Sequence, residues 1–300
     1  MFTLYSRRFD EKQEAQLNMD IRIIIDSAAD FDLTAAKRRG VSVVPMSIQF
    51  GGASFLDGKT ITHDLFYRLL QERKENPSTS QPTPADFLRA FEEVKAAKAA
   101  AVVILISGAL SGTLQSALIA KEMCGYEPIY IVDSTTATAG IQILVNYACK
   151  LRDSGLPAPE IAQAVEKIRD RVRIFAVIDT LEYLRRGGRL TGLQAGLGTM
   201  ARLKPVIAVR DGKVSIVGKA LGTGAAVKQM LKLLSEHPID DAYPSYFLYT
   251  DDKSREELLL PKLKEQNMLP LRLHYSSVGP TIGTHIGPGA LGIAYMERMD

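Results

Sequence analysis

Apolar runs alternate with helical apolar periods along the first half of the chain. Runs rich in Ile and Val at 21–25, 101–106 and 129–132 predict strands, and each is followed by a segment with the apolar spacing of a helix. Unbroken runs of this kind are typical of strands buried on both faces. Strands that alternate with helices favour a parallel sheet with right-handed crossovers. The first half therefore predicts an α/β domain with a mostly parallel sheet.

The second half follows a different plan. The segment 153–159, with one Gly and two Pro, has the punctuation of a linker. Asp211-Gly212 between two apolar runs predicts a hairpin, and further strands and helices follow it. Residues 278–292 are rich in glycine and predict a loop. We expect two α/β domains, over 19–155 and 156–300, the second with a mixed sheet and with a ligand in the cleft between them.

Composition narrows the class of protein. Hydrophobic residues make up 46% and charged residues 24%, as in an ordinary globular domain. The net charge of +3, without a basic block or any Trp, argues against nucleic acid as a partner. No apolar run approaches the ~18 residues needed to span a bilayer, so we expect no membrane insertion. Residues 1–18 are polar and charged and predict a disordered extension rather than a secretory signal.

The two cysteines, Cys124 and Cys149, fall in helical apolar patterns and form no Cys-x-x-Cys motif. Buried thiols are therefore expected, and with them a reducing, cytoplasmic location. No two His residues share metal-ligand spacing, and Gly222–Val227 lacks the third glycine of a dinucleotide fingerprint. We expect neither a metal nor a cofactor.

The loop after the strand at 101–106 carries the clearest chemical signal. Ser, Gly and Thr crowd the segment from Ser107 to Thr113, which opens directly into a helix. We expect the backbone N–H groups of Ser111, Gly112 and Thr113 to be unpaired there and to face an anion. No Lys follows the loop, so the pattern is not that of a triphosphate site. Beyond a simple helix cap, the loop indicates a site for one small anionic group, such as a carboxylate.

Three further residues are candidates for the same site. Thr79 lies in a Pro-bounded Ser/Thr cluster, where hydroxyls can supply convergent donors without adding charge. His285 lies in the glycine-rich segment, and near its reference pKa of about 6.5 it could donate to a carboxylate and gain charge. Arg189, beyond two glycines, is better placed to reach a cleft than Arg185 or Arg186, which suit a helix end.

A serine hydrolase is the main alternative. Ser111, Asp179 or Asp251, and His285 occur in the chain order of the α/β-hydrolases. The sequence at the serine, Gly-Ala-Leu-Ser-Gly, departs from the Gly-x-Ser-x-Gly elbow of those enzymes. An esterase or thioesterase that uses Ser111 and His285 therefore stays open as a second hypothesis, and a small-anion sensor without lipid as a third.

Taken together, several motifs resemble the DegV family over residues 19–300. These motifs are Asp26-Ser27, Thr79–Pro82, Ser107–Thr113, Val132–Ser134, Asp179–Arg189 and Gly283–Ala290. The resemblance implies a two-domain α/β protein that binds a long-chain fatty acid between its domains. The family is similar to the fatty-acid-binding subunits of bacterial fatty acid kinase. There the binding protein performs no chemistry and presents the carboxylate to a separate kinase, which makes an acyl phosphate for phospholipid synthesis.

The resemblance also implies roles for individual residues. Thr79 and Ser111 would hold the carboxylate with the Gly112 amide, joined by His285 and Arg189. A second row of polar side chains is expected behind them, formed by Ser27, Ser80, Ser107 and Thr284. Members of the family usually carry several basic residues near 213–225, thought to serve the kinase partner. Between Gly218 and Gly224 this chain has only Lys219, which weakens the expectation of kinase docking.

Overall fold

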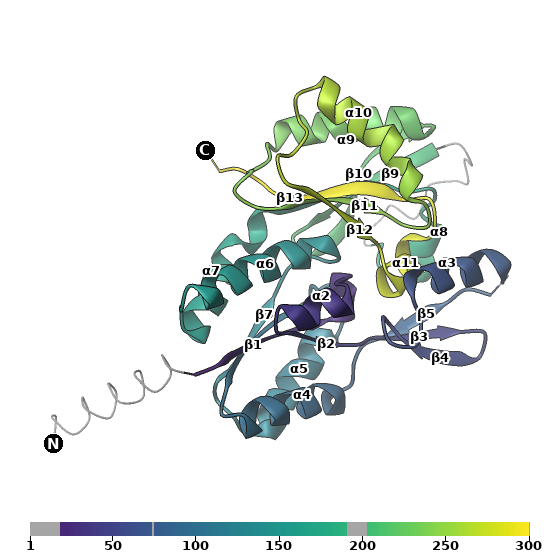
Figure 1. Ribbon diagram of the computed structural model, residues 1–300. Helices are drawn as coiled ribbons and strands as arrows, with labels where there is room; N and C mark the ends of the chain where they lie inside the picture. Colours follow the sequence, from purple (N-terminus) through teal and green to yellow (C-terminus); the bar gives the residue numbers. More distant parts are fainter. Residues whose placement is uncertain (1–18, 74, 191–202, 300) are drawn as a thin grey trace, which may run out of the picture.

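The computed structural model describes residues 19–73, 75–190 and 203–299, so the extension expected at 1–18 lies outside the described residues. Two lobes stack on each other, each built on its own sheet (Figure 1). The N-terminal sheet is fully parallel, with strand order β2-β1-β6-β7. Its strands are β1 (Ile21–Asp26), β2 (Val41–Val44), β6 (Ala100–Leu105) and β7 (Ile129–Asp133).

Both faces of this sheet are covered, as its unbroken apolar strands predict. Side chains alternate between the two faces of a strand. Ile23 and Ile25 therefore share a core with helices on one face, and Ile24 shares a core with helices on the other. The first group of helices is α2 (Leu33–Arg38), α6 (Ala139–Asp153) and α7 (Ala158–Ile168). The second group is α4 (Pro84–Ala96) and α5 (Thr113–Cys124).

A small antiparallel sheet, in the order β4-β3-β5, extends this lobe. Its elements are β3 (Ser47–Phe50), β4 (Ala53–Leu56) and β5 (Ser78–Ser80), with α3 (His63–Glu72) packed beside them. The sequence shows only a Pro-bounded Ser/Thr cluster around Thr79, whereas in the structure Thr79 pairs with Ile48 in the edge strand β5. Three residues are too few to show a strand period, so only the pairing partner reveals this strand.

The C-terminal sheet has six strands in the order β10-β9-β8-β13-β11-β12. All its pairs are antiparallel except β11 with β12, so the mixed sheet that the sequence predicts is confirmed. The strands are β8 (Val172–Val177), β9 (Leu203–Arg210), β10 (Lys213–Leu221), β11 (Ser245–Tyr249), β12 (Leu273–Ser277) and β13 (Leu291–Met296). Helices α9 (Thr223–Glu236) and α10 (Glu256–Glu265) cover one face.

Helix α6 lies between the two sheets and joins the lobes through one continuous core. Helix α7, which a boundary at 155/156 would assign to the C-terminal domain, packs on α6, β6 and β7. The chain thus enters the C-terminal sheet only at β8. Cys124 and Cys149 are buried free thiols, as expected. Within the described ranges, every helix is too short or too polar to cross a membrane.

The glycine-rich segment at 278–292 is not a loop, which corrects the sequence-based expectation. It forms helix α11 (Pro280–Ile286) and the start of β13. Pro280 stands in the first turn, where its missing N–H costs no hydrogen bond, and Gly287 ends the helix at φ 73°. At Gly283 a Cβ atom would lie 2.6 Å from the Tyr67 hydroxyl oxygen, so this glycine permits close packing. A glycine-rich sequence alone does not predict this helix, because the glycines are there to make room for side chains from distant parts of the chain.

Candidate functional site

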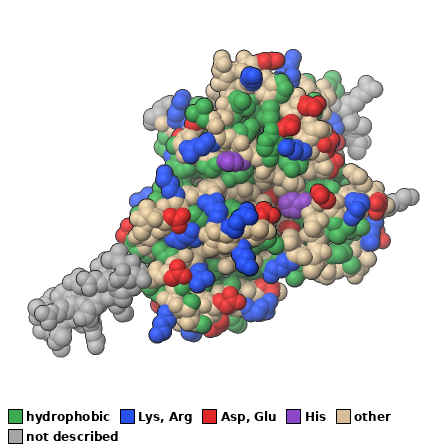
Figure 2. Space-filling view, in the orientation of Figure 1, with side chains coloured by type: hydrophobic (Ala, Val, Ile, Leu, Met, Phe, Trp, Pro, Cys, Tyr) green, Lys and Arg blue, Asp and Glu red, His purple; other side chains and the backbone are tan. Residues whose placement is uncertain are grey.

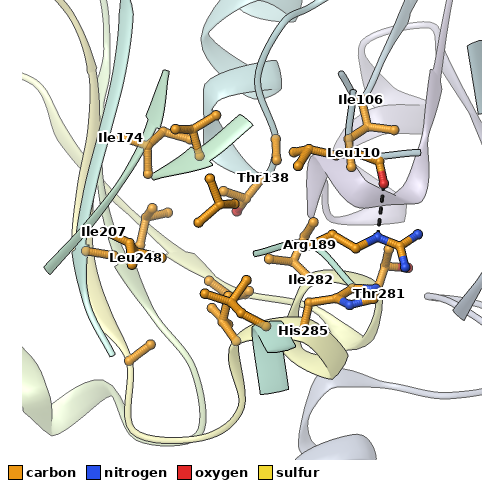
Figure 3. A pocket seen from close by; sticks show the side chains of 18 of the residues that line it. Ile106, Leu110, Thr138, Ile174, Arg189, Ile207, Leu248, Thr281, Ile282 and His285 are labelled. Atoms are coloured by element: carbon orange, nitrogen blue, oxygen red, sulfur yellow. Dashed lines mark hydrogen bonds between the residues drawn. The ribbon is translucent and has the colours of Figure 1, made fainter. Parts of the chain in front are cut away.

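A mostly apolar cavity lies between the C-terminal sheet and the ends of β6 and β7, with an empty space of about 830 Å³ that includes its mouth (Figure 3). Ile174, Ala176 and Ile207 project into it from β8 and β9, because alternate residues of paired strands share one face. Further apolar lining comes from several elements, among them β11 with Leu248 and α11 with Ile282 and Ile286.

Polar groups gather at one end of this cavity. Thr79, Ser111, Arg189 and His285, all candidates from the sequence, line it together. They come from β5, the β6–α5 loop, the segment after α8 (Glu182–Arg186) and α11. Arg189 and His285 lie close together, away from Ile174 on the sheet wall (Figure 3). A cavity with an apolar body and a polar end suits a ligand with a long apolar part and one polar head.

His285 is the best-defined member of the polar end. It lies in the last turn of α11, and its Nε2 is hydrogen-bonded to Thr79 Oγ1 at 2.9 Å. Its Nδ1 is buried without a partner in the described chain. This ring atom faces Gly187, where an added Cβ would lie only 2.1 Å away. Gly187 has an ordinary φ of −73°, so it is the space, and not the backbone conformation, that requires a glycine there.

Electrostatics keep the His285 ring uncharged at neutral pH. Burial, followed by the positive charge of Arg189, lowers the pKa of His285 from 6.5 to about 4. The expectation that it titrates near its reference value is therefore wrong. Arg189 Nε donates to the Leu110 carbonyl at 3.1 Å, and its Nη1 donates to the Gly187 carbonyl at 2.5 Å. The permanent charge at this end of the cavity is the Arg189 guanidinium.

The Ser111 loop differs in part from expectation. The Ser111 N–H donates to the Ser107 carbonyl at 3.1 Å, and the Thr113 N–H reaches Ser111 Oγ at 3.4 Å. Three unpaired amides at this helix start are thus not found. Of these three amides, only the Gly112 N–H lacks a partner among the described residues. Ser111 Oγ is also hydrogen-bonded to Thr113 Oγ1 at 2.8 Å, so the serine hydroxyl is held at the helix start.

Gln81 is a contact that sequence reasoning missed. Its Nε2 donates to the Gly112 carbonyl at 3.1 Å and to Ser116 Oγ at 3.0 Å, which ties the segment after β5 to the first turn of α5. A Cβ on Gly112 would lie 2.1 Å from Gln81 Oε1. Gln81 stands two residues after Thr79 in the same motif, which is the only local signal that points to it.

Two more hydroxyls that line the cavity, those of Thr138 and Thr281, were also missed. Thr138 Oγ1 donates to Asp30 at 2.6 Å, and Thr281 Oγ1 donates to Asp57. Burial raises the pKa of Asp57 to about 6 and raises that of Asp30 well above its usual value. Thr138 has φ 47°, a strained conformation for a β-branched residue, and its bond to Asp30 helps to hold it there.

The residues expected to stand behind the site do not line the cavity in the described structure. Ser27 Oγ accepts from the Met46 amide at 3.0 Å, and Ser107 Oγ donates to the Gly212 carbonyl at 2.7 Å, which joins the loop to the β9–β10 hairpin. Thr284 donates to the Pro280 carbonyl of its own helix at 2.8 Å. Ser80 is exposed, because it follows Thr79 on the opposite face of β5.

Among the described residues, the serine, aspartate and histidine candidates of the hydrolase hypothesis do not form a catalytic triad. Ser111 Oγ bonds to Thr113, and the His285 ring bonds to Thr79 instead. Asp179 accepts from Lys204 at 2.8 Å, and Asp251 accepts from the Gly289 amide at 2.8 Å. A catalytic triad needs a serine–histidine bond and a carboxylate that orients the histidine, and both are missing here. Nor do the described His, Cys, Asp and Glu side chains form a cluster that could hold a metal ion.

Comparison with known proteins places the chain in a family. The model of the family described as "Uncharacterised protein, DegV family" matches residues 20–298. A DegV domain-containing protein of Caldanaerobacter subterraneus is 33% identical over 280 residues, which cover 93% of this chain and 99% of that protein.

Solved structures agree with this assignment. A DegV family protein from Thermus thermophilus, described by its fatty acid binding, matches with a TM-score of 0.83 at 32% identity and covers 93% of this chain and 100% of that one. DegV from Bacillus subtilis, described as a fatty acid binding protein, matches with a TM-score of 0.80 at 25% identity over 94% and 100% of the two chains. The chain belongs to the DegV family.

Proposed function

We propose that this protein binds a long-chain fatty acid, with the acyl tail in the apolar cavity and the carboxylate at its polar end. The observation that carries the proposal is the cavity itself, whose apolar walls lead to Thr79, Ser111, Arg189 and His285 at one end. The fatty acid binding described for the Thermus thermophilus and Bacillus subtilis relatives supports the same ligand class.

The polar end offers donors and one positive charge for the carboxylate. When His285 Nε2–H donates to Thr79 Oγ1, the Thr79 hydroxyl proton is free to be donated to the ligand. Ser111 Oγ and the Gly112 N–H stand at the start of α5, where a helix favours negative charge. Arg189 supplies the counter-charge. In this arrangement His285 orients Thr79 and needs no charge of its own.

The acyl tail and the carboxylate contribute differently to the free energy of binding. Roughly a dozen methylenes at about 0.8 kcal/mol each give on the order of 10 kcal/mol of gross burial energy. A hydrogen bond to a charged group adds about 1.5–3 kcal/mol net. The tail therefore supplies most of the affinity, and the head site fixes where the carboxylate lies.

We further propose that the protein performs no chemistry itself and presents the carboxylate, in the cytoplasm, to a separate fatty acid kinase that forms an acyl phosphate. The reason is the resemblance to the binding subunits of such kinases, together with a serine that has no histidine partner. No cofactor of its own is needed for this role. Lys219 on β10 is the basic residue available between Gly218 and Gly224 for docking.

The test compares the two ends of the cavity. The purified protein is extracted under denaturing conditions, and bound lipid is measured by mass spectrometry. We expect stoichiometric free fatty acid in the wild type, little in Ala176→Phe, which fills the cavity, and near-normal amounts in Thr79→Val and Ser111→Ala. Ser80→Ala is the matched control, because this neighbouring hydroxyl points away from the cavity.

Kinase-dependent acyl phosphate formation should fall strongly in Thr79→Val and Ser111→Ala but not in Ser80→Ala. Equal loss of bound lipid from Ser111→Ala and Ala176→Phe would contradict the division between head and tail. Turnover of acyl esters by the wild type that is lost in Ser111→Ala would replace the binding role with that of an esterase.

A further inference from the structure

A second hollow opens between the lobes and shares no lining residue with the apolar cavity. It lies between α2, α6 and the β11–β12 edge of the C-terminal sheet, with about 1350 Å³ of empty space that includes its open side. We call it the interlobe groove. Nothing in the proposed fatty acid site uses it, and clefts between lobes are frequent ligand sites.

Helix α6 presents a polar stripe to this groove. Gln142, Asn146 and Lys150 recur every four residues and so lie on one face of the helix. Most of the remaining helix is buried between the two sheets. Gln142 Nε2 donates to the Ala29 and Asp30 carbonyls at 2.9 Å, which ties the stripe to the first β–α connection. Gln142 is buried and held by these internal bonds, whereas Asn146 and Lys150 extend the stripe toward the open side of the groove, where this face is available to solvent or to a ligand.

The groove is basic. Arg39, Lys150 and Arg272 line it beside the ring of His274, and no Asp or Glu of the described chain does. None of these three cationic side chains forms a salt bridge with a described residue. Lys150 also suits the last turn of α6 through the helix dipole. Arg272 Nη2 donates to the Asp241 and Ala242 carbonyls at 2.8 and 2.7 Å, which leaves its charge without a carboxylate partner. Lys and Arg side chains gather on this face over α2 (Figure 2).

Aromatic rings form another part of the wall. The tyrosines are Tyr147, Tyr243, Tyr246 and Tyr275. Tyr246 accepts a hydrogen bond from Asn146 at 2.6 Å, and Asn146 accepts one from Arg39, so ring, amide and guanidinium are held as one unit. The Tyr147 and Tyr243 ring centroids are 5.8 Å apart. Tyrosine rings beside positive charges that no described carboxylate neutralises suit a ligand that carries both a ring and an anionic group.

We propose that the interlobe groove binds a small anionic ligand with a flat aromatic ring, of the nucleoside monophosphate class. Its phosphate lies toward Arg39 and Lys150, and its base lies against the tyrosine rings. This site is independent of the fatty acid site, because the two hollows have separate linings.

The test uses three matched probes on the purified full-length protein, measured by isothermal titration calorimetry. AMP carries ring and phosphate, ribose 5-phosphate lacks the ring, and adenosine lacks the charge. We expect AMP to bind at least tenfold more tightly than either of the other two. Lys150→Glu reverses one charge about 5 Å from the phosphate. This variant should bind AMP about tenfold or more weakly than the wild type.

Lys228→Glu on α9 is the matched control and should bind AMP as the wild type does, since Lys228 is exposed and does not line the groove. His274→Glu is the second variant and covers the case in which Lys150→Glu fails to fold. Absence of AMP binding at millimolar concentration, equal binding of ribose 5-phosphate, or unchanged binding in the groove variant that folds would overturn the proposal. Bound fatty acid, measured in the same samples, should not change, so failure here is distinct from failure of the proposed function.

Discussion

The buried ring of His285 makes the stability of the protein depend on pH in a defined window. Unfolded chains protonate histidine near 6.5, whereas burial and Arg189 hold the pKa of His285 in the folded protein at about 4. The unfolded state therefore binds the proton first as the pH falls. Stability that is present above pH 6.5 is lost progressively down to about pH 4, and this difference in pKa corresponds to about 3 kcal/mol.

The measurement is urea unfolding of wild type and His285→Gln at several pH values between 7.5 and 4.5. Glutamine can still bond to Thr79 but does not titrate, so the difference between the two proteins isolates the histidine. Burial raises the pKa of Asp26 to about 7 and that of Asp57 to about 6, and these groups add stability as the pH falls, but they cancel in the comparison. We expect the wild type to lose about 2–3 kcal/mol relative to the variant between pH 7 and 4.5.

A saturating fatty acid should reduce this loss, because its carboxylate offsets the charge of Arg189 beside the ring. A difference between wild type and His285→Gln that stays constant over the whole pH range would refute the reasoning. It would mean that the ring is solvated in the folded protein, because burial is the larger cause of the lowered pKa of His285.

Two further substitutions test the packing at the site. Gly187→Ala should displace the His285 ring, because the new Cβ would lie 2.1 Å from Nδ1. We expect the free energy of unfolding in urea to fall by about 1–3 kcal/mol, and an unchanged value would show that the ring has room to move. Tyr67→Phe removes a buried hydrogen bond of 2.8 Å to the Val278 carbonyl just before α11. We expect the free energy of unfolding to fall by about 1–3 kcal/mol, and a smaller decrease would indicate that water replaces the hydroxyl.

Most of the N-terminal half could be read from local patterns. The strand at 101–106 and the helix after Thr113 follow from an unbroken apolar run and a helical period, both of which are properties of neighbouring residues. The strand β5 and the helix α11 could not be read in this way. Three residues show no period, and the glycines of α11 are there because Tyr67 and other side chains pack against them.

The candidate site, too, could be predicted from the sequence only in part. The loop chemistry at Ser111 pointed to an anion, yet the Ser111 amide proved to be paired with Ser107, a detail of turn geometry that composition does not contain. Thr138 and Thr281 were missed because a threonine in an ordinary sequence context carries no signal until a buried carboxylate is found beside it.

By itself, the sequence determined most of the strands and helices, that a parallel and a mixed sheet follow each other, and that one strand end is rich in donors. Only the tertiary structure decided that Thr79 and His285, 206 residues apart, share a hydrogen bond, and that the ring of His285 is uncharged. The physical reason is that periodicity is a short-range property of the chain, whereas desolvation and the meeting of distant side chains exist only once the two lobes have packed around α6.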